Sequence, residues 1–549
     1  MTNCASTSLL RQGAEMQSSR GLGAFARVGL LAAIALALGS GCATGSGSVE
    51  RRETRDSRPN IVLVLVDDLG QQDVSVPMLE TASALNARFR TPNLEALAAR
   101  GIRYSNAYAA APVCTPSRTA ILTGQSPART HITYWTLEKD RDTSARHPRL
   151  DPPAWEMNGA QPTGAELPAL LAGAGYRTMH VGKAHFGARG TPGSDPCALG
   201  FAVNIAGHAA GAPGSFLGTD HFKDAARKQR GQIAPSDAPA SVWDVPGLEE
   251  WHGQDVWLDD VLAREACDEI TRAAAEGTPF FLHFCPYGVH VPLMEDARFA
   301  GAYAGLDATE RAYASMVASV DDALGRLVAR CESLGILDET IFIFTSDNGG
   351  LSAHGRGMAP DGGRTHVHNA PLRSGKGSAY EGGLRVPFVV AGPGIAYEAR
   401  PRAMPVVGTD LYPTVLALAR VAPPADRACD GIDLSGSWRG QAEPPERAIV
   451  FHQPHKWGPE GPGIEPFSAM RVGDWKLIWF HDDAAAQGSP PRPRLELYDV
   501  AQDPGETRER SAVDAAITAA MRERLRVMLE SMQAQPSVRR DGRRAVRLD

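Results

Sequence analysis

The sequence contains little cysteine, eight residues in 549, and no two of them form a C-x-x-C pair. This spacing argues against a structural zinc knuckle or a thioredoxin-type redox site. The chain also lacks an excess of basic residues: 56 lysines and arginines stand against 63 acidic residues, so no overall positive field favours nucleic acid. Hydrophobic residues make up 43% and charged residues 22%, which excludes a disordered, collagenous or multi-span membrane protein.

Long hydrophobic runs are absent as well. The apolar segment 28–38 has eleven residues, fewer than the about 20 that an ordinary membrane-spanning helix needs. Basic residues before it and small residues after it are typical of a secretory signal, and initiation at Met16 would give that signal a more usual basic region. We therefore expect a leader over 1–42, a flexible linker over 43–58, and export to the periplasm, the outer membrane or the exterior.

The end of the leader leaves the mode of attachment open. Cys42 follows Ser40 and Gly41, as the lipid-bearing cysteine of a bacterial lipoprotein box does, although Gly39 stands where such boxes usually carry leucine. One outcome is a lipid on Cys42 that holds the protein at the membrane. The other is cleavage near Ala43 without a lipid.

From residue 59 onward, strand and helix patterns alternate. A continuous apolar, β-branched run over 61–66 predicts a fully buried strand, and helix–strand units recur after it. The predicted helices cover 91–101, 166–173, 256–275 and 310–333, and the further predicted strands cover 177–181, 279–285 and 340–345. This order predicts an α/β fold with a mainly parallel sheet, whose ligands bind beyond the C-terminal ends of the strands.

Two other parts of the chain follow different patterns. Residues 188–250 are rich in Gly, Ala, Pro and Ser with little periodicity, which indicates a functional insertion. Beyond a change of composition near 425–445, the segments 448–453 and 474–480 resemble strands, and an amphipathic helix is predicted over about 512–534. We expect a catalytic domain over 59–425, a smaller α+β subdomain over 446–536, and a basic, frayed tail over 537–549.

Acidic and amide side chains follow two of the predicted strands. Asp67 and Asp68 end the first strand, and Asp347 and Asn348 follow the strand at 340–345. Each motif alone is also a common turn sequence. Two such ends in one parallel sheet bring together acids that repel one another unless a cation lies between them. Oxygen ligands suit Ca²⁺ or Mg²⁺ better than zinc, so the pattern favours a hard divalent cation.

The segment APVCTPSRTAILTG places Cys114 and Arg118 in a C-x-P-x-R pattern at the start of a predicted helix. The pattern by itself leaves two interpretations open. Cys114 is either a buried thiol or a nucleophile whose pKa is lowered by Arg118 and the helix N-terminus. No arrangement of cysteine and histidine with a supporting Asn or Asp indicates an ordinary thiol enzyme.

Over residues 59–510 the chain resembles the type I sulfatases, and among them the branch of arylsulfatase A and galactosamine-6-sulfatase. The motifs that carry the resemblance are PNIVLVLVDDLG, CTPSRTAILTG, GYRTMHVGKAHFG, HVP, SDNGG, PLRSGKGSAYEGGLRVP, GDWKLI and ELYDVAQDPGE. The resemblance implies an alkaline-phosphatase-like fold: a mixed, mainly parallel sheet flanked by helices, with a smaller C-terminal α+β subdomain. It also implies that a separate formylglycine-generating enzyme oxidises Cys114 to formylglycine.

The resemblance implies a reaction as well. The hydrated aldehyde is a gem-diol, one hydroxyl of which attacks sulfur and expels the alcohol. The second hydroxyl allows sulfate to leave as the aldehyde forms again, an exit that a serine or cysteine ester lacks. Asp67, Asp68, Asp347 and Asn348, with the modified Cys114, would bind Ca²⁺, or Mg²⁺ in its place, which neutralises charge that develops on the sulfuryl group.

The family pattern gives roles to five further residues. Arg118 and Lys183 would hold the gem-diol, and Lys183 and Lys376 would clamp the sulfate oxygens of the substrate. His185 would take the proton of the second hydroxyl during sulfate release. His290 would contact the substrate and protonate the leaving alkoxide as the general acid.

Other motif residues have weaker assignments. Residues 381–383 match the family's EGG and are expected to be structural supports, and His283 is expected to be a core residue inside its strand. His354, His366 and His368 lie in a polar segment that either is an exposed loop or lines the mouth of the site.

The implied activity is hydrolysis of a sulfate ester of a sulfated saccharide outside the cytoplasm. Ala184 and Ala202 replace residues that are common in the family, which leaves the substrate, the hydroxyl position and endo or exo action open. One alternative is a phosphodiester or phosphonate monoester hydrolase of the same superfamily, some of which share C-x-P-x-R. Another is a non-catalytic protein that binds sulfated glycans and keeps Cys114 as a thiol.

Overall fold

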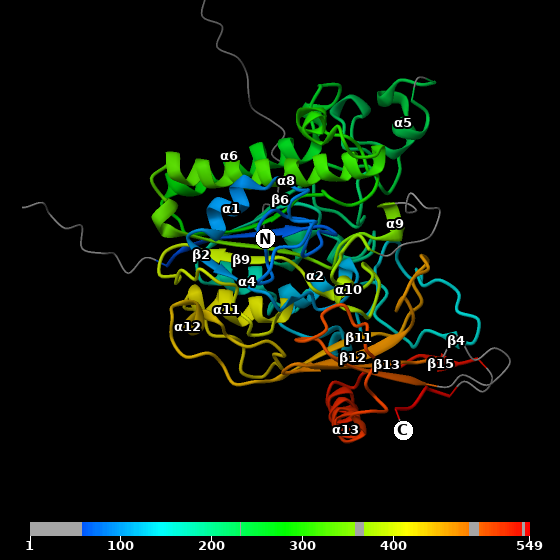
Figure 1. Cartoon of the computed structure of the whole chain (residues 1–549). Helices are drawn as coiled ribbons and strands as arrows, with labels where there is room; N and C mark the ends of the chain where they lie inside the picture. Colours follow the sequence, from blue (N-terminus) through cyan, green and yellow to red (C-terminus); the bar gives the residue numbers. More distant parts are fainter. Residues whose placement is uncertain (1–57, 231, 357–366, 483–492, 541–543, 549) are drawn as a thin grey trace, which may run out of the picture. The chain divides into compact units, whose positions relative to one another are not determined.

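A mixed seven-stranded sheet carries the larger part of the fold (Figure 1). We describe it from a computed structural model, in which residues 58–230, 232–356, 367–482, 493–540 and 544–548 are the described ones. Across these residues the sheet contains, in spatial order, β2 (Gly101–Arg103), β9 (Phe388–Ala391), β8 (Thr340–Ser346), β1 (Asn60–Val66), β7 (Phe280–Cys285), β5 (Arg177–Gly182) and β6 (Val203–Ile205).

The strand directions confirm the predicted α/β class. β1 pairs in parallel with both β8 and β7, and β5 pairs in parallel with β7 and β6. β9 runs antiparallel to β8 and to β2, so the sheet is mixed but mainly parallel. The strands at the centre and the helices between them begin and end within a few residues of the predicted bounds. The short strands β2, β6 and β9 are additions that the sequence pattern did not indicate.

Helices cover both faces of the sheet because the strand side chains alternate between two apolar cores. Val62, Val64 and Val66 of β1 belong to one core, and the side chains between them belong to the other. Figure 1 shows α6 and α8 over one face and α11 and α12 over the other. The helices of the first core are α1 (Pro92–Ala98), α6 (Leu258–Glu276) and α8 (Ala308–Ser333); those of the second are α2 (Cys114–Thr123), α4 (Leu167–Gly173), α11 (Leu411–Leu418) and α12 (Ser435–Trp438).

A second, antiparallel sheet follows near the C-terminus. Its four strands in order are β11 (Ala448–Gln453), β12 (Phe467–Val472), β13 (Trp475–Phe480) and β14 (Arg494–Asp499). One face packs on α13 (Ala515–Ser531), and the other packs against residues of the larger part such as Tyr108 and Tyr380. An α+β arrangement is therefore present where the composition predicts one.

The basic tail is more ordered than expected. β15 (Val538–Arg539) pairs antiparallel with β4 (Leu150–Asp151), and Arg540 forms an ion pair with Asp151 at 2.7 Å. Val546 is buried in the core of the C-terminal sheet. The expectation of a frayed tail was wrong because two apolar side chains among the arginines find partners on the folded surface.

Short elements complete the described chain. They are the two-residue strands β3 (Ala107–Tyr108) and β10 (Val406–Val407), which pair in parallel, and the single-turn helices α3 (Pro127–Thr130), α5 (Asp224–Lys228), α7 (Ala297–Ala300), α9 (Ala353–Arg356) and α10 (Glu381–Leu384). The described residues of 188–250, all but residue 231, contain only β6, α5 and 3₁₀ turns as regular elements, in agreement with their weak periodicity. In the described part of the chain no helix is both long and apolar enough to cross a bilayer. Cys42 and the leader lie outside the described residues.

Candidate active site

Two neighbouring strands bring the predicted oxygen ligands together. β1 and β8 pair in register from Asn60 to Val66, so the residues that follow each strand emerge at the same edge of the sheet. Asp67, Asp68, Asp347 and Asn348 are all completely buried there. The backbone N–H of Asp68 donates to Asp347 Oδ1 at 3.3 Å, and Asn348 Nδ2 donates to Asp68 Oδ1 at 2.8 Å. The four predicted oxygen ligands therefore lie together at one edge of the sheet.

Cys114 is the first residue of helix α2, and its side chain points at this cluster. Val113 is extended, and the helix begins at Cys114. The Sγ atom lies 3.7 Å from Asp67 Oδ1 and 3.5 Å from Lys376 Nζ. Every residue of α2 is buried, so the helix presents its positive N-terminal end to the site from a fixed position.

Three cations match the three carboxylates. Arg118 lies one turn after Cys114 in α2, and its Nε donates to Asp347 Oδ2 at 2.7 Å. Lys183 Nζ donates to Asp67 Oδ2 at 2.7 Å. Lys376 Nζ lies 2.6 Å from Asp68 Oδ1. Buried pairs of this kind gain little stability because desolvation offsets their attraction, so a concentration of three at one sheet edge indicates a binding or catalytic site.

The site fits a hard divalent cation. Asn348 Oδ1 is a buried acceptor with no hydrogen-bond partner among the described residues. The ligand atoms of Asp67, Asp68, Cys114 and His290 all lie within 4.8 Å of one another. Burial raises the pKa of Asp67 well above its ordinary value, against the lowering effect of Lys183, and Asp347 raises it further. A cation among these oxygens would relieve that crowding of carboxylates.

His185 is held in the state that a proton acceptor needs. Its Nε2 lies 2.8 Å from the carbonyl oxygen of Thr136, which can only accept, so Nε2 carries the proton. Nδ1 is therefore the basic nitrogen, and it is buried with no hydrogen-bond partner in the described part of the chain. Burial, with Lys183 nearby, lowers the pKa of His185 well below its ordinary value and keeps the ring neutral.

His290 has the opposite orientation. Its Nδ1 donates to the carbonyl of Val291 at 2.9 Å, so Nε2 is the nitrogen that faces the site, 3.5 Å from Asp68 Oδ2. Burial first, and then Lys376, lowers the pKa of His290, while Asp68 opposes that shift. A proton on Nε2 would lie between the imidazole and the place where a substrate enters.

Asp259 positions the loop that carries His290, and the sequence motifs did not identify it. It lies in the first turn of α6, completely buried, and its carboxylate accepts from the backbone N–H of Tyr287 at 2.9 Å and of Gly288 at 3.1 Å. The same loop is joined to the first strand end, because Val289 N donates to the carbonyl of Asp67 at 2.8 Å. An acid at a helix start is too common a pattern to have indicated this role.

Cys114 lies in the wall of a cavity of about 520 Å³. His185, His290 and Lys376 line the same cavity, whereas Arg118, Lys183 and the four oxygen ligands lie behind it. Tryptophans and residues of the 188–250 insertion form much of the remaining lining. A larger cleft of about 1110 Å³ elsewhere on the molecule contains none of these site residues.

The motif residues with weaker assignments differ in whether they line the cavity. His354 lines the cavity and packs edge-on against Trp457, with ring centroids 4.9 Å apart. His368 lies 4.0 Å from a carboxylate oxygen of Glu310 and does not line the cavity, and His366 lies outside the described residues. Glu381 is buried and pairs with Lys476 at 2.8 Å, away from the cavity.

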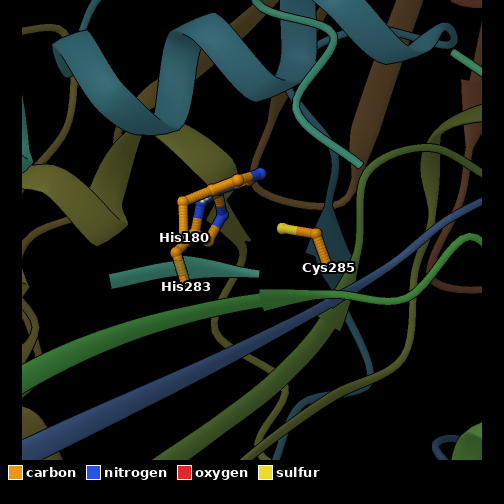
Figure 2. Close-up of side chains that lie close together, drawn as sticks. All are labelled: His180, His283 and Cys285. Carbon is orange, nitrogen blue, oxygen red and sulfur yellow. Dashed lines mark hydrogen bonds between the residues drawn. The ribbon is translucent and has the colours of Figure 1, made fainter. Parts of the chain in front are cut away.

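A second buried cluster is part of the core. Figure 2 shows His180 and His283 from the neighbouring strands β5 and β7, with Cys285 at the end of β7. The two Nδ1 atoms lie 3.2 Å apart, as in a hydrogen bond between neutral imidazoles. The ring of His283 stacks with Phe201 and Phe281 at interplanar angles of 6° and 12°. His283 is thus a core residue, as expected.

Comparison with known proteins agrees with the geometry of the site. Residues 59–421 match the family model described as Sulfatase, and residues 375–535 match the model of the N-sulphoglucosamine sulphohydrolase C-terminal region. The chain belongs to the sulfatase family. The predicted family and fold class are therefore confirmed, and the family generally uses a metal and a formylglycine.

Relatives of this sulfatase carry names that refer to different substrates. The N-acetylgalactosamine-6-sulfatase of Sus scrofa is 33% identical over 72% of this chain and 68% of its own length. The arylsulfatase A of Bos taurus is 29% identical over 82% of this chain and 83% of its own length. The crystal structure of Ps i-CgsB in complex with k-i-k-neocarrahexaose has a TM-score of 0.66 and 26% identity, over 86% of this chain and 93% of that one. The chain spans about two thirds of the length of the galactosamine-6-sulfatases.

Proposed function

We propose that this sulfatase hydrolyses a sulfate ester of a saccharide through a formylglycine derived from Cys114. The observation that carries the proposal is the position of Cys114 at the helix N-terminus, 3.5 Å from Lys376 Nζ and 3.7 Å from Asp67, in the wall of a cavity. Burial raises the pKa of the Cys114 thiol to about 12, so an unmodified thiol would stay protonated and react poorly. When present, formylglycine supplies a gem-diol hydroxyl as the nucleophile.

Four oxygen donors would hold the metal. Asp67, Asp68, Asp347 and Asn348 would bind Ca²⁺, or Mg²⁺ in its place, and the unpartnered Asn348 Oδ1 supports this assignment. The bound cation would lower the pKa of the attacking hydroxyl and neutralise charge on the sulfuryl group. Three lysine and arginine charges already balance the three carboxylates, so a divalent ion makes the site positive, which favours an anionic substrate.

The remaining residues bind the ester and move protons. Lys376 lies beside Sγ and would bind a sulfate oxygen, and Lys183 would share this role once the substrate competes for its contact with Asp67. Arg118 would fix the positions of two residues around the nucleophile, because its side chain donates to Asp347 and to the carbonyl of Lys183, the latter at 2.7 Å.

His185 would accept a proton at Nδ1 during sulfate release, and its hydrogen bond to Thr136 leaves that nitrogen free to do so. His290 would donate a proton from Nε2 to the leaving alkoxide after charging in the presence of the anionic substrate.

The wider setting follows from the sequence. A formylglycine-generating enzyme would modify Cys114, and the leader would direct the protein out of the cytoplasm, with a lipid on Cys42 as one means of attachment. The catalytic domain would span 59–425 and the C-terminal subdomain 446–536. Relatives named for galactosamine-6-sulfate and a relative solved with a hexaose support a saccharide substrate.

The test compares 4-nitrophenyl sulfate with the diester bis(4-nitrophenyl) phosphate in wild type and in Cys114→Ala. We expect faster turnover of the sulfate ester, and a loss of several orders of magnitude in the variant without a change in Tm. Faster turnover of the phosphate ester would favour the phosphodiester or phosphonate hydrolase alternative. Near wild-type rates in Cys114→Ala would refute the nucleophile.

A further inference from the structure

The insertion at 188–250 forms one preorganised side of the active-site cavity. Gly211, Ala212, Pro213 and Trp243 all line it. The N–H of Gly214 donates to the carbonyl of Trp243 at 2.6 Å, which joins two segments of the insertion. A side of the cavity that is tied together in this way loses little conformational entropy when a ligand binds.

Two basic residues of the insertion, Arg227 and Lys228 of α5, also line this cavity. Arg227 Nε donates to the carbonyl of Gly214 at 2.8 Å, and Nη2 pairs with Asp224 at 2.9 Å. Lys228 pairs with the second oxygen of Asp224 and is 63% exposed. Both side chains therefore keep donors that are not used within the described chain, namely Arg227 Nη1 and two of the three protons on Lys228.

The cavity has an excess of positive charge. Among its described lining residues, Arg227, Lys228 and Lys376 are cationic and Asp224 is the one carboxylate. Lys376 is balanced by Asp68 behind the cavity, and Asp224 balances one of the other two charges. One positive charge remains on the insertion side, although the chain as a whole carries a net charge of -7.

Three tryptophans line the cavity together with these charges. Trp135 and Trp243 are half-buried and Trp457 is buried, and all three line the cavity. Their broad apolar faces suit the C–H faces of a sugar ring, and their indole N–H groups suit its hydroxyls. A purely apolar leaving group would fit the same rings but would leave Arg227 Nη1 and the two remaining protons of Lys228 unused.

We propose that Arg227 and Lys228 form a subsite for a second anionic group, so that the preferred substrate is a saccharide that carries a sulfate or a carboxylate besides the scissile sulfate. The inference rests on the proposed function, because it concerns the substrate of the same site. The scissile sulfate binds beside Cys114 and Lys376, the sugar packs on the tryptophans, and the second anion reaches the insertion side. Exposed rim charges of this kind act on association and specificity, and salt screens them.

The test uses pairs of saccharides that share the scissile sulfate. Each O-monosulfated hexosamine is compared with the disulfated hexosamine that keeps the same sulfate, and with a disaccharide in which a uronate replaces the second sulfate. The measured quantity is the ratio of kcat/KM for the dianionic substrate to that for the monoanionic one. We expect a wild-type ratio of about 10 at low salt, which falls toward 1 as the ionic strength rises.

The variants are Arg227→Gln, Lys228→Gln and Lys228→Glu, with Arg230→Gln as the matched control. Arg230 belongs to the same segment and pairs with Asp220, but it does not line the cavity. We expect each neutral variant to lower the ratio about threefold or more, Lys228→Glu to bring it below 1, and Arg230→Gln to leave it unchanged.

The outcomes separate this inference from the proposed function. Equal ratios in wild type and in all variants would overturn the subsite while sulfate-ester turnover persists. If the variants do lower the ratio, a higher kcat/KM for the disulfated sugar identifies the second anion as sulfate. A higher kcat/KM for the uronate disaccharide identifies it as a carboxylate. Absence of turnover on any sulfate ester would instead count against the proposed function.

Discussion

Gly211 offers a sharp test of the role proposed for His185. A Cβ atom built on Gly211 would overlap Nδ1 and Cε1 of the His185 ring, the part of the ring that carries the basic nitrogen. The overlap requires a displacement of about 1 Å to restore ordinary van der Waals contact. The backbone of Gly211 does not have a positive φ, so alanine is otherwise compatible with the local conformation.

A shift of that size affects one step more than the others. Misplacement of a catalytic group by about 1 Å can cost on the order of 100-fold in rate. If His185 assists sulfate release, Gly211→Ala slows release and leaves the attack on an activated aryl sulfate fast. We expect kcat to fall by about 10- to 100-fold. A pre-steady-state burst of 4-nitrophenol, equal to the enzyme concentration, should precede the slow turnover.

Stopped-flow absorbance with 4-nitrophenyl sulfate measures the burst and the steady rate together. Gly305→Ala is the control, because a Cβ there meets no atom within 4 Å. A Gly211→Ala enzyme that shows wild-type kcat, or a lower kcat without a burst, would refute the assignment of His185 to sulfate release.

Three further predictions follow from the same geometry. His290→Ala should reduce kcat/KM more for saccharide sulfates, whose leaving groups are poor, than for 4-nitrophenyl sulfate, and equal losses would contradict its role as an acid. Burial raises the pKa of Asp259 to about 7, so its carboxyl binds a proton more tightly in the folded protein than in the unfolded chain. The stability of the protein should therefore fall as pH rises from about 4 to about 7. Asp259→Asn should remove this slope in Tm measured against pH, and an unchanged slope would exclude Asp259 as its source. Chelation should lower both activity and Tm. Ca²⁺ at about 100 times the wild-type Kd should restore about 2.7 kcal/mol of stability in wild type, and less at the same concentration in Asn348→Ala. A Tm that responds neither to chelation nor to Ca²⁺ would count against the metal site.

The central part of the fold could be predicted because its signals are local. The run over 61–66 is buried on both faces of the sheet and is therefore apolar throughout, and the long helix α8 shows the helical period over its whole length. Short strands such as β6, at one edge of the sheet, and β9, between β2 and β8, owe their structure to pairing with distant strands, and three or four residues leave little pattern in the sequence. The same limit explains the tail, whose order depends on contacts with β4.

The sequence motifs predicted which residues meet at the candidate site, but they did not predict the residues that support them. Asp67 and Asp347 follow strands whose parallel pairing places them side by side, so sequence order and sheet topology were enough. Asp259 and Gly211 act through contacts with residues that are distant in the sequence, and neither residue type carries a distinctive pattern. Of the histidines whose position the sequence left open, His354 lines the cavity and His368 lies near Glu310.

The mass of the peptide that contains Cys114 tests the central claim most directly. Trypsin should release Tyr104–Arg118 from the active protein. Conversion of the cysteine to formylglycine lowers the mass of this peptide by about 18 Da, since SH and H are exchanged for O. The account predicts that the fraction of converted peptide equals the fraction of catalytically active enzyme. Full activity in protein whose Cys114 is an unmodified thiol would contradict it.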